Sequence, residues 1–208
     1  MLTEPLTFEG HFIRLLPLSL SHHERLCAIG LEPALWQHTT IRVQTPREMR
    51  RYIEQALESQ AAGTALPFVI VLQATGEIVG TTRYHAIVRE HHRREVGFSW
   101  VGLPWQRSPV NTEAKYLLLT YAFEQARCQR VEFKADSQNE RSCRALLRIG
   151  ATREGTLRQY MYSAQKGARD IALFSIIDVE WPDIKARLEQ RLYKRNTDPT
   201  NEGAAQHG

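Results

Sequence analysis

The sequence contains few cysteines, and their spacing offers no site for cysteine chemistry. Cys27, Cys128 and Cys143 are odd in number and scattered, and no Cys-x-x-Cys pair occurs. This pattern argues against a disulfide framework and a zinc site, and it is typical of a protein in a reducing cytoplasm. Three histidines, His85, His91 and His92, also lack a ligand spacing with acidic or cysteine residues, so we expect no metal.

Long apolar runs are absent as well. No stretch approaches the ~20 residues needed to span a bilayer. The opening residues, MLTEPLTFEG, lack a basic segment followed by an apolar one, so we expect neither a membrane span nor a signal peptide. The net charge of +4 is too diffuse to indicate nucleic-acid binding, although it would help attract a small polyanion.

The length indicates a single domain. A chain of 208 residues is long enough for one hydrophobic core, and a second full domain would be cramped. Residues 195–208 are small and polar and include Pro199, which is typical of a disordered tail. We therefore expect one domain over residues 1–194.

Hydrophobic periodicity predicts more strands than helices. Apolar runs predict strands over residues 8–16, 67–72, 78–88, 95–101, 131–135, 154–162 and 169–179. Helical spacing predicts helices over 21–29, 45–62, 112–126, 137–149 and 182–192. Ser21 would cap the first helix, and capping boxes at Thr45–Glu48 and Ser137–Glu140 would open the second and fourth. This mixed order indicates an α+β domain built on a largely antiparallel sheet.

Residues 95–126, read as a strand, a bend and a helix, form the central segment. Pro104 and Pro109 prevent the bend from continuing either a strand or a helix. The helix predicted from Thr112 begins directly after the bend, so its unpaired N–H groups and positive dipole end would face whatever lies there. Such an arrangement suits an anion such as a pyrophosphate.

The sequence resembles the Gcn5-related N-acetyltransferases (GNAT), in particular the branch containing the RimJ/RimL-type protein N-terminal acetyltransferases. Two strings carry the resemblance, GLPWQRSPVNTEAK and the later ADSQNERSCRALLRIGATREGTLR, and it extends over residues 7–192. It implies a seven-stranded mixed sheet, flanked by helices, that splays open beside the central strand. It also implies that acetyl-CoA binds there, with its pantetheine arm along the strand and its pyrophosphate at the bend and helix start.

The resemblance assigns residues of the strand, the bend and a later helix to acetyl-CoA. They are Phe98, Trp100, Val101, Gln106, Arg107, Ser108, Val110, Asn111, Thr112, Asn139 and Ser142. The bend departs from the common family pattern, because no glycine lies between Gly102 and Gly150 and Pro109 removes one N–H donor. Asn111 tolerates a left-handed conformation, so we expect it to allow the turn. An ordinary surface position is the alternative for Arg107.

Acetyl transfer to an amine needs a base for the amine proton, a donor for the oxyanion and a proton source for the thiolate. The resemblance implies Glu95 as the base, acting through water, and Ser142 beside the CoA sulfur. Asn139 and Ser142 lie three apart in a predicted helix and therefore share a face. His85 is a rival base. Each of these residues also has a structural alternative. Asn139 would satisfy backbone groups at the helix start, Ser142 would be a solvated polar residue, and His85 would be structural. Glu95 would be exposed and paired with Arg93 or Arg94.

The acceptor site is the least readable part of the sequence. Arg158, Tyr160 and Tyr162 lie on the strand that commonly lines this site in the family, and Trp36 and His85 are further candidates; core packing is the alternative for the aromatic residues. We therefore expect an acetyl-CoA-dependent N-acetyltransferase. Its acceptor would be a primary amine: a protein N-terminus, a free amino acid, a polyamine or an amine-bearing antibiotic. The alternative is a non-catalytic protein that binds CoA or a partner and retains the fold; homodimers, common in the family, are compatible with both.

Overall fold

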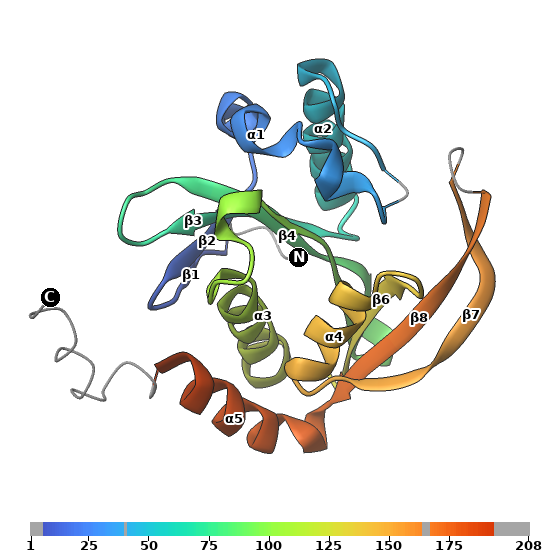
Figure 1. Cartoon of the computed structure of the whole chain (residues 1–208). Helices are drawn as coiled ribbons and strands as arrows, with labels where there is room; N and C mark the ends of the chain where they lie inside the picture. The colour runs from blue at the N-terminus through green and yellow to red at the C-terminus, as the bar shows by residue number, and fades with distance from the viewer. Residues whose placement is uncertain (1–5, 40, 164–166, 194–208) are drawn as a thin grey trace, which may run out of the picture.

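This computed structural model describes residues 6–39, 41–163 and 167–193, and its strands form one mixed sheet. Its strand order is β1-β2-β3-β4-β5-β6-β8-β7 (Figure 1). Neighbouring strands are antiparallel, except that β5 and β6 are parallel. The predicted α+β class is therefore confirmed. The strands are β1 (Phe8–Glu9), β2 (Ile13–Pro17), β3 (Leu66–Leu72), β4 (Ile78–Val88), β5 (Arg93–Val101), β6 (Arg130–Asp136), β7 (Thr152–Ser163) and β8 (Gly167–Ile177).

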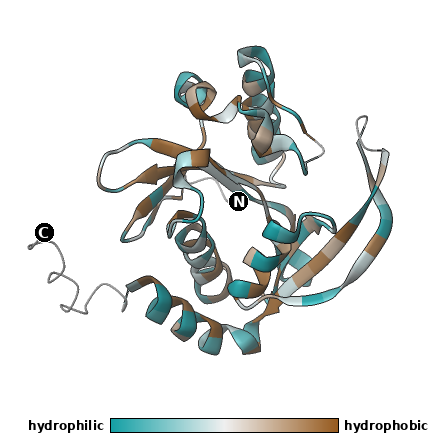
Figure 2. Ribbon diagram, viewed as in Figure 1, coloured by the Kyte–Doolittle hydropathy of each residue, from teal (hydrophilic) through white to brown (hydrophobic). Residues whose placement is uncertain are grey.

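Helices cover both faces of the sheet (Figure 1). On one face lie α1 (His23–Gly30) and α2 (Pro46–Ala61), and on the other lie α3 (Val110–Thr120), α4 (Glu140–Arg148) and α5 (Trp181–Tyr193). Each face has its own hydrophobic cluster, and β3 contributes to both: Phe68 and Ile70 to one, Val69 and Val71 to the other. Burial on two faces explains why β3 is apolar throughout. By contrast, α4 is largely hydrophilic (Figure 2).

The sheet opens between β5 and β6. The two strands pair only over Arg93–Glu95 and Arg130–Glu132. Beyond this point β5 continues to Val101 paired with β4 alone, and β6 continues to Asp136 paired with β8 alone. The splay implied beside the central strand is therefore present, and its apex is at Glu95.

Helix starts agree with the sequence in one case and differ in three. In α2 the Thr45–Glu48 capping box is confirmed, because each side chain accepts a hydrogen bond from the backbone N–H of the other. The first helix instead opens with a 3₁₀ turn, Leu20–His22, which follows Ser19 rather than Ser21 as N-cap. In α3 the first residue is Val110 rather than Thr112, since Pro109 already has helical torsion angles.

The start of α4 was also predicted wrongly. Its N-cap is Asn139, whose side chain accepts a hydrogen bond from the N–H of Ser142 at 3.1 Å. Ser137 lies outside the helix, because its own N–H donates to the carbonyl of Asp170. Both residue types are good N-caps, and tertiary pairing decides between them.

The extra strand arises from a buried carboxylate. The predicted single strand 8–16 is two strands, β1 and β2, so the sheet has eight strands where seven were expected. The side chain of Glu113, on α3, occupies the turn between them and accepts three backbone N–H bonds at 2.8 Å, from His11, Phe12 and Ile13. The hydroxyl of Tyr193 donates to the same carboxylate at 3.0 Å. Glu113 thus ties the N-terminal turn and α5 to α3.

Three further expectations concern a membrane span, the segment 30–40 and the C-terminal tail. No helix in the ranges given above is long and apolar enough to cross a membrane. The segment 30–40, which the sequence left unassigned, contains a 3₁₀ turn, Pro33–Trp36. The predicted disordered tail, 195–208, lies outside the described residues, so it and the domain boundary at 194 stay predictions.

We expect Glu113→Ala to lower the free energy of unfolding by about 3–5 kcal/mol, because it leaves several buried N–H groups without an acceptor. Urea unfolding followed by circular dichroism measures this. Glu58→Ala, an exposed position on α2, is the control and should change stability by no more than about 0.5 kcal/mol. Equal effects of the two substitutions would contradict the role given to Glu113.

Candidate active site

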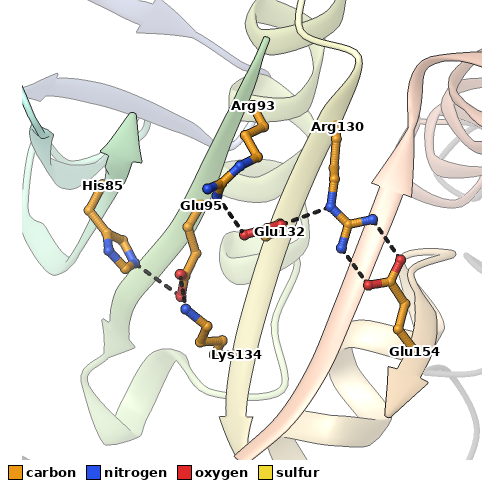
Figure 3. Close-up of polar contacts among 7 residues, drawn as sticks. All are labelled: His85, Arg93, Glu95, Arg130, Glu132, Lys134 and Glu154. Carbon is orange, nitrogen blue, oxygen red and sulfur yellow. Dashed lines mark hydrogen bonds and ion pairs between the residues drawn. The ribbon is translucent and has the colours of Figure 1, made fainter. Parts of the chain in front are cut away.

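Glu95 lies at the apex of the opening and is buried. It is the last β5 residue paired with β6, and its exposed fraction is 4%. One carboxylate oxygen lies 3.2 Å from Nε2 of His85, the residue opposite on β4, and the other 2.9 Å from Nζ of Lys134 on β6 (Figure 3). The alternative of an exposed Glu95 in a charged turn is therefore wrong, because the side chain belongs to a strand and pairs across both neighbouring strands.

The surroundings of Glu95 keep it ionised. Burial alone would raise the pKa of its carboxyl group, but the hydrogen bonds and charges of His85 and Lys134 outweigh burial and lower the pKa below its ordinary value. The same contact raises the pKa of Lys134 against the opposing effect of its own burial. At neutral pH the pair is therefore a carboxylate and an ammonium, and the carboxylate can accept a hydrogen bond from His85.

His85 complements Glu95 rather than competing with it. If Nε2–H donates to Glu95, the other ring nitrogen, Nδ1, keeps its lone pair and can accept a proton. Gly97 leaves room for this contact, since a Cβ at that position would lie 2.5 Å from Nε2 of His85. The ring also contacts Phe98 edge-on, with centroids 4.9 Å apart. Glu95 and His85, the two candidate bases predicted from the sequence, thus form one hydrogen-bonded pair.

A ladder of charges beside this pair holds the closed end of the sheet (Figure 3). Glu132, the β6 neighbour of Glu95, lies 3.3 Å from Nη1 of Arg93 and 2.8 Å from Nε of Arg130. Arg130 also forms two hydrogen bonds with Glu154 on β7, and mainly for this reason the pKa of Glu154 is lowered to about 2. The ladder links β5 to β6 where these two strands pair, and Arg130 extends it across β8 to Glu154 on β7.

The bend after β5 is fixed by side chains in the absence of glycine. Its left-handed residue is Arg107, with φ of 63°, so the expectation for Asn111 is wrong: Asn111 lies inside the first turn of α3. Ser108 Oγ donates to the carbonyl of Trp105 at 2.6 Å. Gln106 donates to the carbonyl of Val101 at 3.0 Å and accepts from Arg141 of α4 at 2.6 Å, so it bridges the bend to both sides of the opening.

Donors for an anion are present beside this bend. Within the described ranges, the backbone N–H groups of Asn111 and Thr112 make no hydrogen bond, as expected for the first turn of a helix. Arg107 precedes them, and Arg141, which sequence reasoning missed, lies across the opening. Arginine in the first turn of α4, beside the Asn139 cap, was the only sequence signal for it.

The remaining predicted residues divide between core and surface. Trp36 is 6% exposed, donates to the carbonyl of Gly30 and packs against Tyr52 and Trp100, which favours the core alternative. Trp100 and Val101 are also buried, so only their backbone can serve a ligand, whereas Phe98 is 39% exposed.

The other candidates lie on the strand β7 and at the start of the helix α4. On β7, Tyr160 is half exposed and its ring centroid lies 5.3 Å from Nζ of Lys134, so it joins the group around Glu95. The side chains of Arg158 and Tyr162 are exposed and make no hydrogen bond or ion pair with the rest of the described chain. Ser142 is in the first turn of α4, where its N–H is capped by Asn139 and its hydroxyl has no partner among those residues.

Comparison with known proteins places this geometry in a family. A sequence model of the acetyltransferase (GNAT) domain matches residues 13–152. A crystal structure of a GCN5-related N-acetyltransferase from Brucella melitensis is 29% identical, with a TM-score of 0.86 over 94% of this chain and 89% of that one. Two Bacillus subtilis proteins are also similar. YoaA, an uncharacterised N-acetyltransferase, is 35% identical over 50% of this chain, and YdaF, provisionally named a ribosomal N-acetyltransferase, is 29% identical over 51%. The chain spans 57% of the length of each.

We expect Lys134→Met to raise the pKa of Glu95, because desolvation remains while one of two stabilising partners is lost. An NMR titration of the Glu95 carboxyl carbon measures this directly. Lys185→Met, which removes the partner of Glu124, is the control and should leave the pKa of Glu95 unchanged.

The same shift has a consequence for stability. Because the folded-state pKa of Glu95 lies below the ordinary value of 4.5, its ionised form stabilises the fold above pH 4.5, and that stabilisation is lost as the pH falls through the folded-state pKa. The stability deficit of Lys134→Met should therefore be largest near neutral pH and should shrink in acid. A deficit that does not depend on pH, or an unchanged Glu95 pKa, would show that the ion pair does not act in this way.

Proposed function

Because the chain belongs to the GNAT acetyltransferase family, we propose that it transfers the acetyl group of acetyl-CoA to a primary amine by direct attack. The observation that carries this proposal is the position of the Glu95–His85 pair, whose carboxylate is buried at the point where β5 and β6 separate. A base located there lies next to the open edge of β5. The match to YdaF supports the RimJ/RimL-like branch, and with it a protein N-terminus as one acceptor class.

The residues around the opening fit acetyl-CoA. Beyond Glu95, β5 has no strand partner on the side of β6, so its backbone can pair with the amides of a pantetheine arm. The free N–H groups of Asn111 and Thr112 suit a pyrophosphate, and Arg107 and Arg141 add positive charge on the two sides of the opening. These residues bind and orient the co-substrate, and they require no glycine in the bend.

The chemistry needs only groups that are present. As the amine nitrogen attacks the thioester carbonyl, His85 Nδ1 takes the amine proton and Glu95 stabilises the resulting imidazolium through Nε2–H. A backbone N–H on the open edge of β5 would stabilise the oxyanion. When the C–S bond breaks, the Ser142 hydroxyl would donate to the departing thiolate. No covalent intermediate on the enzyme is formed.

Measurements of acetyl-CoA binding and of acetyl transfer to amines test the proposed function. Calorimetry measures binding, and a thiol-release assay over a panel of amines measures transfer in the same buffer. We expect binding together with turnover on at least one amine. Binding without turnover on any amine would favour the non-catalytic alternative, and absence of acetyl-CoA binding would refute the proposed acetyl transfer.

Glu95→Gln should lower kcat/KM by about 10²- to 10⁴-fold, because the general base His85 would lose the carboxylate that stabilises its imidazolium, and it should leave acetyl-CoA affinity unchanged. Glu132→Gln is the matched control, since it removes a neighbouring carboxylate from the same face while keeping the Glu95–His85 pair. His85→Gln should match Glu95→Gln if His85 takes the proton; near wild-type activity of His85→Gln would assign that step to Glu95 through water.

Ser142→Ala should lower kcat by about 10-fold while the fold stays intact, because the helix cap uses the backbone N–H of Ser142 and not its hydroxyl. The loss of kcat should be greatest with acceptors for which departure of the thiolate limits the rate. Comparing kcat of Ser142→Ala and Ser137→Ala measures this. Equal kcat values in the two variants would remove Ser142 from the chemistry.

A further inference from the structure

Arg83 is a buried cation that lacks an anionic partner. It lies on β4, opposite Gly97 of β5 and on the same face as His85, and it is 7% exposed. Within the described residues its side chain forms no hydrogen bond or ion pair, and its Nε is buried without an acceptor. Its contacts are aromatic: the guanidinium carbon lies 3.2 Å from the ring centroid of Phe98 and 5.8 Å from that of Tyr52.

This isolation distinguishes Arg83 from the other cations of the same region. Lys134, Arg93 and Arg130 each have a carboxylate partner there. Burial lowers the pKa of Arg83, yet an arginine stays protonated in proteins, so the positive charge is retained at a cost in solvation. The Phe98 ring offsets part of this cost through a cation–π contact. A buried guanidinium with free donors is suited to a carboxylate, which it can bind through two parallel hydrogen bonds.

A second arginine with buried nitrogens that lack acceptors shows why the position of Arg83 matters. Arg94 also has buried nitrogens without acceptors, but it lies against Tyr84 and Tyr121, both buried in the hydrophobic cluster beneath α3. No ligand can reach it without opening the core. Arg83 instead lies against Phe98, whose ring is 39% exposed, so its surroundings reach the surface beside the Glu95–His85 pair.

We propose that Arg83 binds the carboxylate of the acceptor, and that the acceptor is a free amino acid. Alternate residues of a strand are about 7 Å apart, so His85 and Arg83 can each form a hydrogen bond of about 3 Å to one small molecule. The amine and the carboxylate of an α-amino acid, which are attached to one carbon atom, match that separation. The fixed charge of Arg83 also favours the neutral, reactive form of the nearby amine. This inference rests on the proposed acetyl transfer and names its substrate class.

The binding test does not require turnover. N-acetylglycine, N-acetyl-leucine and N-acetylglutamate, which correspond to products, are titrated by calorimetry against their carboxamide counterparts, with and without CoA. We expect at least one acid to bind about 10-fold or more tightly than its amide, the usual contribution of a hydrogen-bonded charge. Arg83→Gln should remove this difference, Arg83→Lys should retain part of it, and Arg51→Gln, an exposed position on α2, should leave it unchanged. Circular dichroism verifies that each variant is folded.

Two results would overturn the role of Arg83: acids and amides that bind alike in wild type, including the case where none binds, or a preference for acids that survives Arg83→Gln. In the turnover arm, free amino acids, their amides and tripeptide amides compete as acceptors. A higher KM for amino acids in Arg83→Gln, with kcat less affected, supports the proposal, whereas tripeptide amides as the preferred acceptor overturn it. Failure of acetyl-CoA to bind would instead refute the proposed acetyl transfer. The comparison of acids with amides would still test whether Arg83 binds a carboxylate.

Discussion

The parallel pairing of β5 with β6, which stops after Glu95 and Glu132, is the constraint on which the site depends. Before that point the strands are held by backbone hydrogen bonds and by the Arg93–Glu132–Arg130 contacts. After it, β5 retains backbone groups without a strand partner on one side, and exposed edge groups of this kind call for a ligand or another strand. The same opening gives a ligand access to Glu95, although the side chain itself is buried. Strand pairing thus sets both where the proposed co-substrate would lie and where the Glu95–His85 pair is located.

Burial at that apex then determines the chemistry of the side chains. An isolated buried carboxylate would become protonated, but Lys134 and His85 supply enough positive charge and hydrogen bonding to keep Glu95 ionised. A carboxylate stabilised in this way is a weak proton acceptor and a good hydrogen-bond acceptor. It is therefore better suited to orient His85 and stabilise its charged form than to remove the amine proton directly. The ion pair with Lys134 and the contact with His85 are parts of one arrangement.

Local sequence predicted the elements that local interactions decide. The apolar run of β3 and the Thr45–Glu48 capping box are determined by neighbouring residues, and both were identified. The division of the first strand was missed because Glu113 acts on the turn from about a hundred residues away in the chain. Glu95 was predicted as a base from its place in the family pattern, but its ionised state at a buried position depends on Lys134, on a different strand. A lysine in a strand gives no sequence signal of its partner.

The bend shows how a family feature can be retained after its usual residue is lost. Glycine would allow unusual torsion angles and close approach of a ligand, but it would also leave the loop mobile before binding. Here Arg107 adopts the left-handed conformation, at a cost of about 1 kcal/mol, and Gln106 and Ser108 hold the loop through hydrogen bonds to Val101 and Trp105. Pro109 further fixes the backbone at the entry to α3. The conformational entropy lost on binding is thereby smaller, so a glycine-free bend is compatible with tight binding of a pyrophosphate.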